Sequence, residues 1–232
     1  MRTYATAQLL GTRTHQCDAT AVCTAPDGAR AYVLLDGIGS NDTVRAWTRA
    51  AAKRLARTAA HCGDAESALR ALHARYAAEP ERQRPWAVGP DACAVVVVTV
   101  PGKQLATVAW CGDSRAYLLT DDGLVRLTDD HNLRRVNGGN RNQITSCLGS
   151  TYTDEVLLAD CGHPAVEAAT LPASGRLLLA SDGAYEPLED SCRNLAAYLG
   201  GDPRTAARHF VQSAIDHAGP HVDNATVLVA DL

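Results

Sequence analysis

The chain lacks a clear excess of either charge and has no long apolar run. Among its 232 residues, Lys and Arg total 22 and Asp and Glu total 26, which gives a formal net charge of −4. This balance disfavours a basic nucleic-acid-binding protein. No apolar run approaches the roughly 20 residues that cross a bilayer, and residues 1–11 lack the pattern of a signal peptide. We therefore expect a cytoplasmic protein with no nucleic-acid and no membrane partner.

The sequence also lacks any C-x-x-C pair, although it contains eight cysteines. A zinc ribbon or a thioredoxin-type motif would need such a pair. A chain of this length buries a sizeable core without disulfides, so we interpret most of the thiols as small buried side chains. Apolar residues make up 46% and charged residues 21%, which is ordinary globular composition. We expect a monomer with a single domain over residues 1–232.

Apolar runs and helical periodicity predict the order of the elements. The expected strands cover residues 31–35, 92–100, 105–111, 115–119, 124–127, 155–158, 166–170, 176–181 and 225–231. The expected helices cover residues 44–62, 65–78, 191–199 and 204–217, and prolines predict a loop over residues 79–90. The helices are too few and too bunched for regular β-α alternation. The sequence therefore predicts an α+β fold, a four-layer α-β-β-α sandwich of two antiparallel sheets flanked by helix pairs.

Four aspartates stand where apolar strands end or begin. Asp36 and Asp182 each follow an apolar run and precede a glycine, Asp113 follows Gly112, and Asp223 comes just before the last strand. One such aspartate alone is more often part of a turn. A charged carboxylate at the end of a buried strand is disfavoured unless something compensates it. Hard divalent cations bind carboxylate, carbonyl and water oxygens, so four such positions together favour a metal site.

The ordered motifs resemble those of the type 2C metal-dependent serine/threonine protein phosphatases, in particular the bacterial members of this PPM-type family. The resemblance runs from about residue 7 to residue 232. The segments that carry it stand in the family's order: 11–19 (GTRTHQCDA), 34–39 (LLDGIG), 109–117 (AWCGDSRAY), 127–131 (LTDDH), 146–149 (SCLG), 178–183 (LLASDG) and 223–227 (DNATV). The family's fold, a sandwich of two antiparallel sheets between helix pairs, agrees with the predicted elements.

The resemblance implies two bound Mg²⁺ or Mn²⁺ ions and a third, weaker site. The implied ligands are Asp18, Asp36, the carbonyl of Gly37, Asp113, Asp182 and Asp223. Asp36 would bridge the two ions, Asp182 and Asp223 would hold one of them, and Asp18 would support the other directly or through water. Asp113, together with Asp182, matches the third site of bacterial members.

The resemblance also implies the reaction. A water between two cations loses a proton readily and would attack phosphorus in line, without a phosphoenzyme. Asp36 and Arg13 would be the catalytic residues, and Arg13 would clamp the phosphate with two N–H donors, which a lysine could not mimic. The expected substrates are proteins that carry phosphoserine or phosphothreonine, and the expected partner is a Ser/Thr kinase.

Several positions depart from the family pattern. Cys17 stands where the family often has Glu or Gln, and a thiol is a poor ligand for hard cations. Ser40 and Asn41 replace a usual Gly-His pair, and the flap segment over residues 131–146 is short. These departures keep a second hypothesis open, a pseudophosphatase that binds a phosphoprotein or a kinase. Basic residues beside the flap, Arg135 and Arg141 among them, could attract phosphorylated substrate, but we interpret them as part of a solvated loop.

Overall fold

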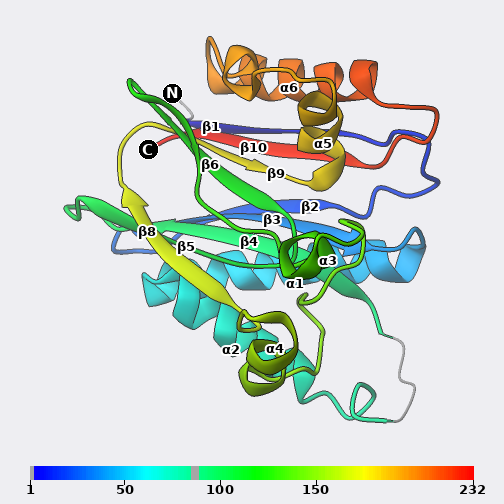
Figure 1. The fold of residues 1–232 in the computed structure, drawn as a ribbon. Helices are drawn as coiled ribbons and strands as arrows, with labels where there is room; N and C mark the ends of the chain where they lie inside the picture. The colour runs from blue at the N-terminus through cyan, green and yellow to red at the C-terminus, as the bar shows by residue number, and fades with distance from the viewer. Residues whose placement is uncertain (1–2, 85–88) are drawn as a thin grey trace.

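The fold is built from two five-stranded antiparallel sheets packed face to face (Figure 1). The structure is a computed structural model that describes residues 3–84 and 89–232. The first sheet has the order β1 (Tyr4–Leu9), β10 (Ala225–Asp231), β9 (Arg176–Ala180), β6 (Arg115–Thr120), β7 (Gly123–Arg126). The second has the order β2 (Ala19–Thr24), β3 (Arg30–Ile38), β4 (Asp91–Thr99), β5 (Leu105–Cys111), β8 (Glu167–Pro172). The predicted α+β sandwich is confirmed.

The central strands read as continuous apolar runs because both of their faces are buried. In β3, Tyr32 and Leu34 point into the core between the sheets, where they pack with residues of β9 and β10 such as Leu179 and Leu228. Val33, which alternates with them, packs instead in the core beneath the first helix pair. This is the period-2 pattern of a strand with two buried faces.

Helices cover both outer faces of the sandwich (Figure 1). The second sheet is covered by α1 (Asp42–Cys62) and α2 (Ala65–Ala77), and the first by α5 (Asp182–Asp190) and α6 (Pro203–His217). Asn41 is the N-cap of α1, because its side chain accepts a hydrogen bond from the Val44 amide at 2.9 Å. The described chain contains no helix that is both long and apolar enough to cross a membrane.

The structure corrects two of the predicted elements. Residues 155–158, predicted as a strand, lie in helix α4 (Asp154–Cys161), which Thr153 caps at its start and Gly162 ends in the left-handed region. Of the predicted helix over residues 191–199, only the short 3-10 helix η1 (Leu195–Tyr198) is present. The α-helix α5 begins earlier, at Asp182, and ends at Asp190. At residues 155–158 the caps at Thr153 and Gly162 outweigh the apolar pattern, and only Leu157 of the helix is buried.

Three further elements and one loop complete the comparison. Strands β1 and β2 were not predicted, and both are only partly buried, so they lack a continuous apolar run. A five-residue helix, α3 (Leu133–Asn137), lies in the short flap segment. Of the predicted loop over residues 79–90, the part at 79–84 consists of turns, and residues 85–88 lie outside the described residues.

Candidate metal and phosphate site

The predicted site residues come from separate segments that meet at one end of the sandwich. They lie in the β1–β2 loop, at the end of β3, in the β5–β6 turn, at the start of α5 and just before β10: Arg13, Asp18, Asp36, Gly37, Asp113, Asp182 and Asp223. Six of them line one cavity of about 200 Å³, and Asp18 does not reach it. Six of the seven residues that the sequence predicts for one site therefore do line one cavity in the fold.

The end of β3 places Asp36 and Gly37 at the cavity. Strand β4 runs antiparallel beside it, with Cys93 opposite Asp36 in register. Gly37 is buried, and a Cβ at this position would lie only 2.6 Å from both the Cys17 carbonyl oxygen and the Thr48 hydroxyl. Only glycine fits here, so the end of β3 can pass close to the segment that enters β2.

The β5–β6 turn carries Asp113. Gly112 adopts a φ of +103°, and a Cβ on it would collide with the Cys93 side chain. The amide of His131 donates to the Gly112 carbonyl at 2.9 Å, and the hydroxyl of Tyr185 donates to the Asp113 carbonyl at 3.0 Å. The turn is thus held from two sides, which fixes the Asp113 carboxylate at the cavity wall.

Burial and the neighbouring carboxylates raise the pKa values of Asp36, Asp113 and Asp182. Burial raises the pKa of Asp36 well above its usual range, and the neighbouring carboxylates of Asp18 and Asp182 raise it further. Burial, with Asp182 as the next cause, raises the pKa of Asp113 to about 8. The pKa of Asp182 is raised as well, again chiefly by burial. Like charges this close cannot all stay ionised without a compensating cation or proton.

Asp18 lies behind the cavity at the entry to β2. It is 2% exposed, and no described residue donates a hydrogen bond to either of its carboxylate oxygens. Burial raises its pKa to about 7. One oxygen of Asp113 is buried and unpaired in the same way. Buried carboxylate oxygens without donors are costly, so each of these oxygens is a candidate contact for a cation or its coordinated water.

The donor set fits hard divalent cations. It consists of carboxylate oxygens and one backbone carbonyl, the ligands that Mg²⁺ and Mn²⁺ prefer. Among residues 3–84 and 89–232, no three His, Cys, Asp or Glu side chains already stand together as a ligand group.

Arg13 is the cationic side chain at this cavity. Its Nη2 donates to Oδ2 of Asp223 at 2.5 Å, with both side chains roughly half exposed. The preceding loop docks on the same segment, because Thr12 exchanges hydrogen bonds with Val222. Gly11, with a φ of +65°, approaches so closely that a Cβ would collide with the carbonyls of Val222 and Asp223. The loop thereby aims Arg13 at the cavity mouth.

Cys17, the departure expected to weaken a metal site, does not line the cavity. It is 1% exposed, and its Sγ donates to the Asn41 carbonyl at 3.7 Å. Its amide donates to Oδ1 of Asn224 at 2.8 Å, and Nδ2 of Asn224 donates to the Leu10 carbonyl at 2.9 Å. Asn224 thus joins the β1–β2 loop to the segment that carries Asp223, a positioning role that the sequence motif alone did not reveal.

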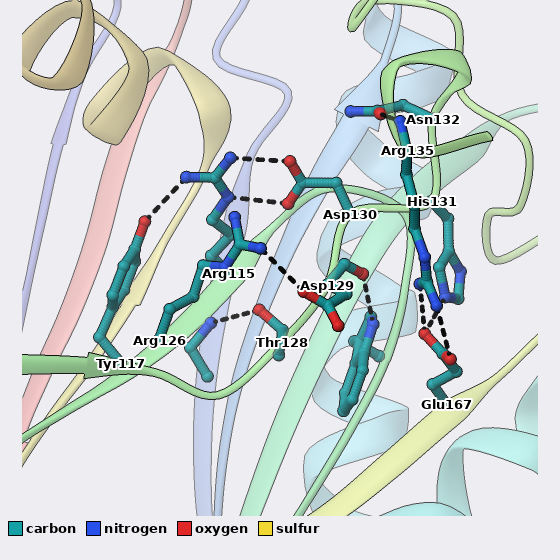
Figure 2. A network of polar contacts seen from close by, with 12 residues as sticks. Arg115, Tyr117, Arg126, Thr128, Asp129, Asp130, His131, Asn132, Arg135 and Glu167 are labelled. Atoms are coloured by element: carbon teal, nitrogen blue, oxygen red, sulfur yellow. Dashed lines mark hydrogen bonds and ion pairs between the residues drawn. The ribbon is translucent and has the colours of Figure 1, made fainter. Parts of the chain in front are cut away.

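The residues after Asp113 form a second network behind the site (Figure 2). Arg115 makes two hydrogen bonds of 2.7 Å to the carboxylate of Asp130, and it also contacts Glu189 and the hydroxyl of Tyr117. These bonds join the GDSR and DDH segments, which lie apart in the sequence but stand side by side here. The Arg115 side chain is only 9% exposed and is paired with two carboxylates, so it supports the turn of Asp113 rather than binding a ligand.

Two of the basic residues beside the flap, Arg135 and Arg141, are paired with carboxylates. Arg135 makes a bidentate pair with Glu167 (Figure 2). Arg141 pairs with Asp190 at 2.6 Å and with Glu186 at 3.0 Å, both on α5. The expectation of a solvated loop is therefore corrected for these two arginines, whose charges are already neutralised by carboxylates. The ion pairs of Arg141 tie the flap to the helix that begins with Asp182.

Five cavity residues are not among the predicted site residues: Ile38, Gly39, Cys93, Asn142 and Ile144. Cys93 lies inside an apolar run and shows no local signal, since only its register opposite Asp36 places it at the site. Ile38 could have been found, because it stands two residues after Asp36 and therefore on the same face of the strand.

Comparison with known proteins agrees with this geometry. A sequence profile described as Protein phosphatase 2C matches residues 37–138. The serine/threonine protein phosphatase PstP of Mycobacterium tuberculosis H37Rv is 28% identical over 223 residues, which cover 88% of this chain and 41% of PstP. The chain thus spans about two fifths of the length of that relative.

Solved structures show the same fold. The catalytic domain of PstP in complex with two manganese ions is 26% identical and superposes with a TM-score of 0.70, covering 98% of this chain and 96% of that one. The serine/threonine phosphatase of S. agalactiae superposes with a TM-score of 0.77 at 16% identity, covering 99% and 98%. Motif order, fold and the carboxylate cavity agree with these comparisons, and residues 37–138 match the protein phosphatase 2C family.

Proposed function

We propose that this chain is a metal-dependent phosphatase that hydrolyses phosphoserine and phosphothreonine in proteins. The observation that carries the proposal is the cavity itself: carboxylates with raised pKa values surround it, and an arginine stands at its mouth. The relative PstP, whose catalytic domain was solved with two manganese ions, supports the choice of cation and reaction.

The proposed ligands are the oxygens already described, those of Asp18, Asp36, Gly37, Asp113, Asp182 and Asp223. Mn²⁺ or Mg²⁺ bound there would lower the pKa of a coordinated water and neutralise charge on the phosphoryl oxygens. Asp36 is central among these residues, because it interacts with Asp18, Asp113 and Asp182 at once. Asp113 and Asp182 are the proposed ligands of the third, weaker site.

Arg13 is the proposed phosphate-binding residue. Its planar guanidinium can direct two N–H groups at two phosphate oxygens, and its position at the cavity mouth lets it do so without entering the carboxylate cluster. The Asp223 carboxylate orients it from one side. Arg13 would hold the phosphate with phosphorus facing the ions.

We further propose that the protein works in the cytoplasm as a monomer, on proteins phosphorylated by a Ser/Thr kinase. The near balance of charges and the apolar packing of both sheets beneath helices support a globular protein that needs no partner to complete its core. Size-exclusion chromatography with light scattering tests the monomer.

The experiment is hydrolysis of a phosphothreonine peptide with Mn²⁺, with Mg²⁺ and with a chelator, alongside Asp182→Asn. We expect turnover that needs the metal and falls by at least ~1,000-fold in the variant, because several kcal/mol of transition-state stabilisation depend on the ions. Asp122→Asn, in the exposed β6–β7 turn, is the matched control. A folded protein that binds Mn²⁺ but hydrolyses nothing would instead indicate the pseudophosphatase.

A further inference from the structure

Two exposed or half-exposed isoleucines flank the charged cavity. Ile38, at the end of β3, is 45% exposed, and Ile144 comes from the flap on another side of the cavity. The rest of the lining consists of aspartates, Arg13, glycines, Asn142 and Cys93. Ile38 and Ile144 thus present apolar surface beside the polar cavity. A substrate group attached next to the phosphate could bury this surface.

A second cavity of about 270 Å³ adjoins the first, and Ile144 lines both. Asp91, which also lines the second cavity, is the residue opposite Ile38 in the β3–β4 register. The shared lining residue Ile144 thus places the second cavity next to the carboxylate cavity. A polypeptide that continues beyond its phosphorylated residue could pass over Ile144 from one cavity to the other.

The charges of the second cavity are already paired. Arg82 donates to Oδ1 of Asp91 at 2.7 Å, to the Gly149 carbonyl at 2.8 Å and to the Pro90 carbonyl at 2.6 Å. Its side chain is only 7% exposed. Because the guanidinium of Arg82 already binds these three oxygens, it does not offer a site for a second phosphate. This disfavours pyrophosphate and nucleotide substrates at the second cavity.

Hydroxyls form much of the remaining lining of the second cavity. Thr145 is hydrogen-bonded to His163 at 2.8 Å, and Ser146 donates to the Ala165 carbonyl at 2.7 Å. Ser150 accepts from the Tyr152 amide at 3.2 Å. Such neutral groups suit the main chain or an uncharged side chain of a peptide rather than a charged ligand.

We propose that Ile38 and Ile144 select phosphopeptides with an aliphatic residue beside the phosphorylated one, and that the peptide continues across Ile144 into the second cavity. This inference rests on the proposed phosphatase function and names its substrate class. Contact of one aliphatic side chain with both isoleucines would give a preference of roughly five- to tenfold over a serine at that position.

The test compares two phosphothreonine peptides of equal length, one with leucines and one with serines on both sides of the phosphothreonine. With Mn²⁺, the wild type should hydrolyse the leucine peptide with a kcat/KM about five- to tenfold higher. Ile38→Ser and Ile144→Ser should each bring this ratio toward one. Leu105→Ser, a matched change of a 56% exposed residue at the opposite end of β5, should keep it.

The ratio is measured within each variant, so an overall loss of activity does not disturb it, and the wild-type comparison needs no variant at all. Equal kcat/KM values for the two peptides in the wild type, or an unchanged ratio in both isoleucine variants, would overturn the inference. If the folded, Mn²⁺-binding wild type hydrolyses neither peptide, the proposed function itself is wrong.

Discussion

The guanidinium of Arg13 is hydrogen-bonded to the carboxylate of Asp223, 210 positions away in the sequence, at 2.5 Å. The hydrogen bond to Asp223 is the main cause that raises the pKa of Arg13, so the arginine remains charged. The proposed phosphate-binding residue therefore touches a proposed ion-binding residue. This contact joins the two halves of the site before any substrate enters.

Arg13→Ala should lower kcat/KM for a phosphopeptide by about 100-fold, because charged donors to the phosphoryl oxygens are lost. Mn²⁺ affinity should change far less, since the carboxylates remain. Steady-state kinetics and calorimetric Mn²⁺ titration measure the two effects. Arg45→Ala, which breaks an exposed pair with Asp42 on α1, is the control. Equal losses of catalysis and Mn²⁺ binding would mean that Arg13 only supports the structure.

The raised carboxylate pKa values predict how the metal-free protein responds to pH. Folded Asp18 and Asp113 have pKa values of about 7 and about 8, against 3.8 when unfolded. The folded state therefore binds more protons than the unfolded state, so the free energy of unfolding falls as pH rises through this range. His73 and His131, whose pKa values are lowered, affect stability only below about 6.5.

In a chelator, the melting temperature should thus fall as pH is raised from 6.5 to 9, and Mn²⁺ should restore it more strongly at the higher pH. Thermal denaturation followed by circular dichroism checks both trends. Asp113→Asn should flatten the fall, whereas Asp122→Asn on the surface should not. A metal-free melting temperature that is constant over this range would contradict the electrostatic description of the cavity.

The carboxylate site could be predicted because its residues follow strand ends with strong local signals. Asp36 and Asp182 each interrupt an apolar run that the fold buries on both faces. Other residues that line the cavity could not be predicted from such local signals. Cys93 reaches the cavity only through the pairing of β3 with β4, and Ile144 only through the path of the flap.

Helix capping explains one error in the predicted secondary structure and one departure from the family pattern. Residues 155–158 are apolar enough for a strand, yet the capping hydroxyl of Thr153 and the left-handed Gly162 delimit a helix there. Asn41 is one of the departures from the family pattern that keep the pseudophosphatase hypothesis open, and in the structure its side chain caps α1. In both places the capping residue stands in the sequence at the position where the helix begins.

The anchoring of the flap predicts a mutant that affects substrate binding more than stability. Arg141 joins the flap to α5 through Glu186 and Asp190. Surface ion pairs contribute about 0–1 kcal/mol, so Arg141→Ala should barely change the melting temperature. Loosening Ile144 should nevertheless raise KM for a phosphopeptide by roughly three- to tenfold, since positioning contacts are lost. Arg126→Ala, which breaks the exposed pair with Asp129, should leave KM unchanged.

The support behind Asp113 predicts a pH-dependent loss of stability in Glu167→Gln. Glu167 accepts hydrogen bonds from Arg135 and pairs with Nε2 of His131 at 2.9 Å (Figure 2). Burial opposes its charge, but these two partners outweigh burial and lower its pKa to about 2. Loss of the charge-assisted bonds should cost about 1–3 kcal/mol of unfolding free energy at pH 7.

The sign of the pH effect follows from the depressed pKa. A carboxylate with a folded pKa of about 2 stabilises the fold fully above its unfolded value of 4.5 and loses this contribution as pH falls toward 2. Urea denaturation at pH 7, 5 and 3 should therefore show wild type and Glu167→Gln converging at the lowest pH. Glu155→Gln, on the exposed face of α4, should match the wild type throughout. If the difference in unfolding free energy between wild type and Glu167→Gln is as large at pH 3 as at pH 7, Glu167 stabilises the fold through packing and not through its charge. The hydrogen bond from the His131 amide to the Gly112 carbonyl would then not depend on the charge of Glu167.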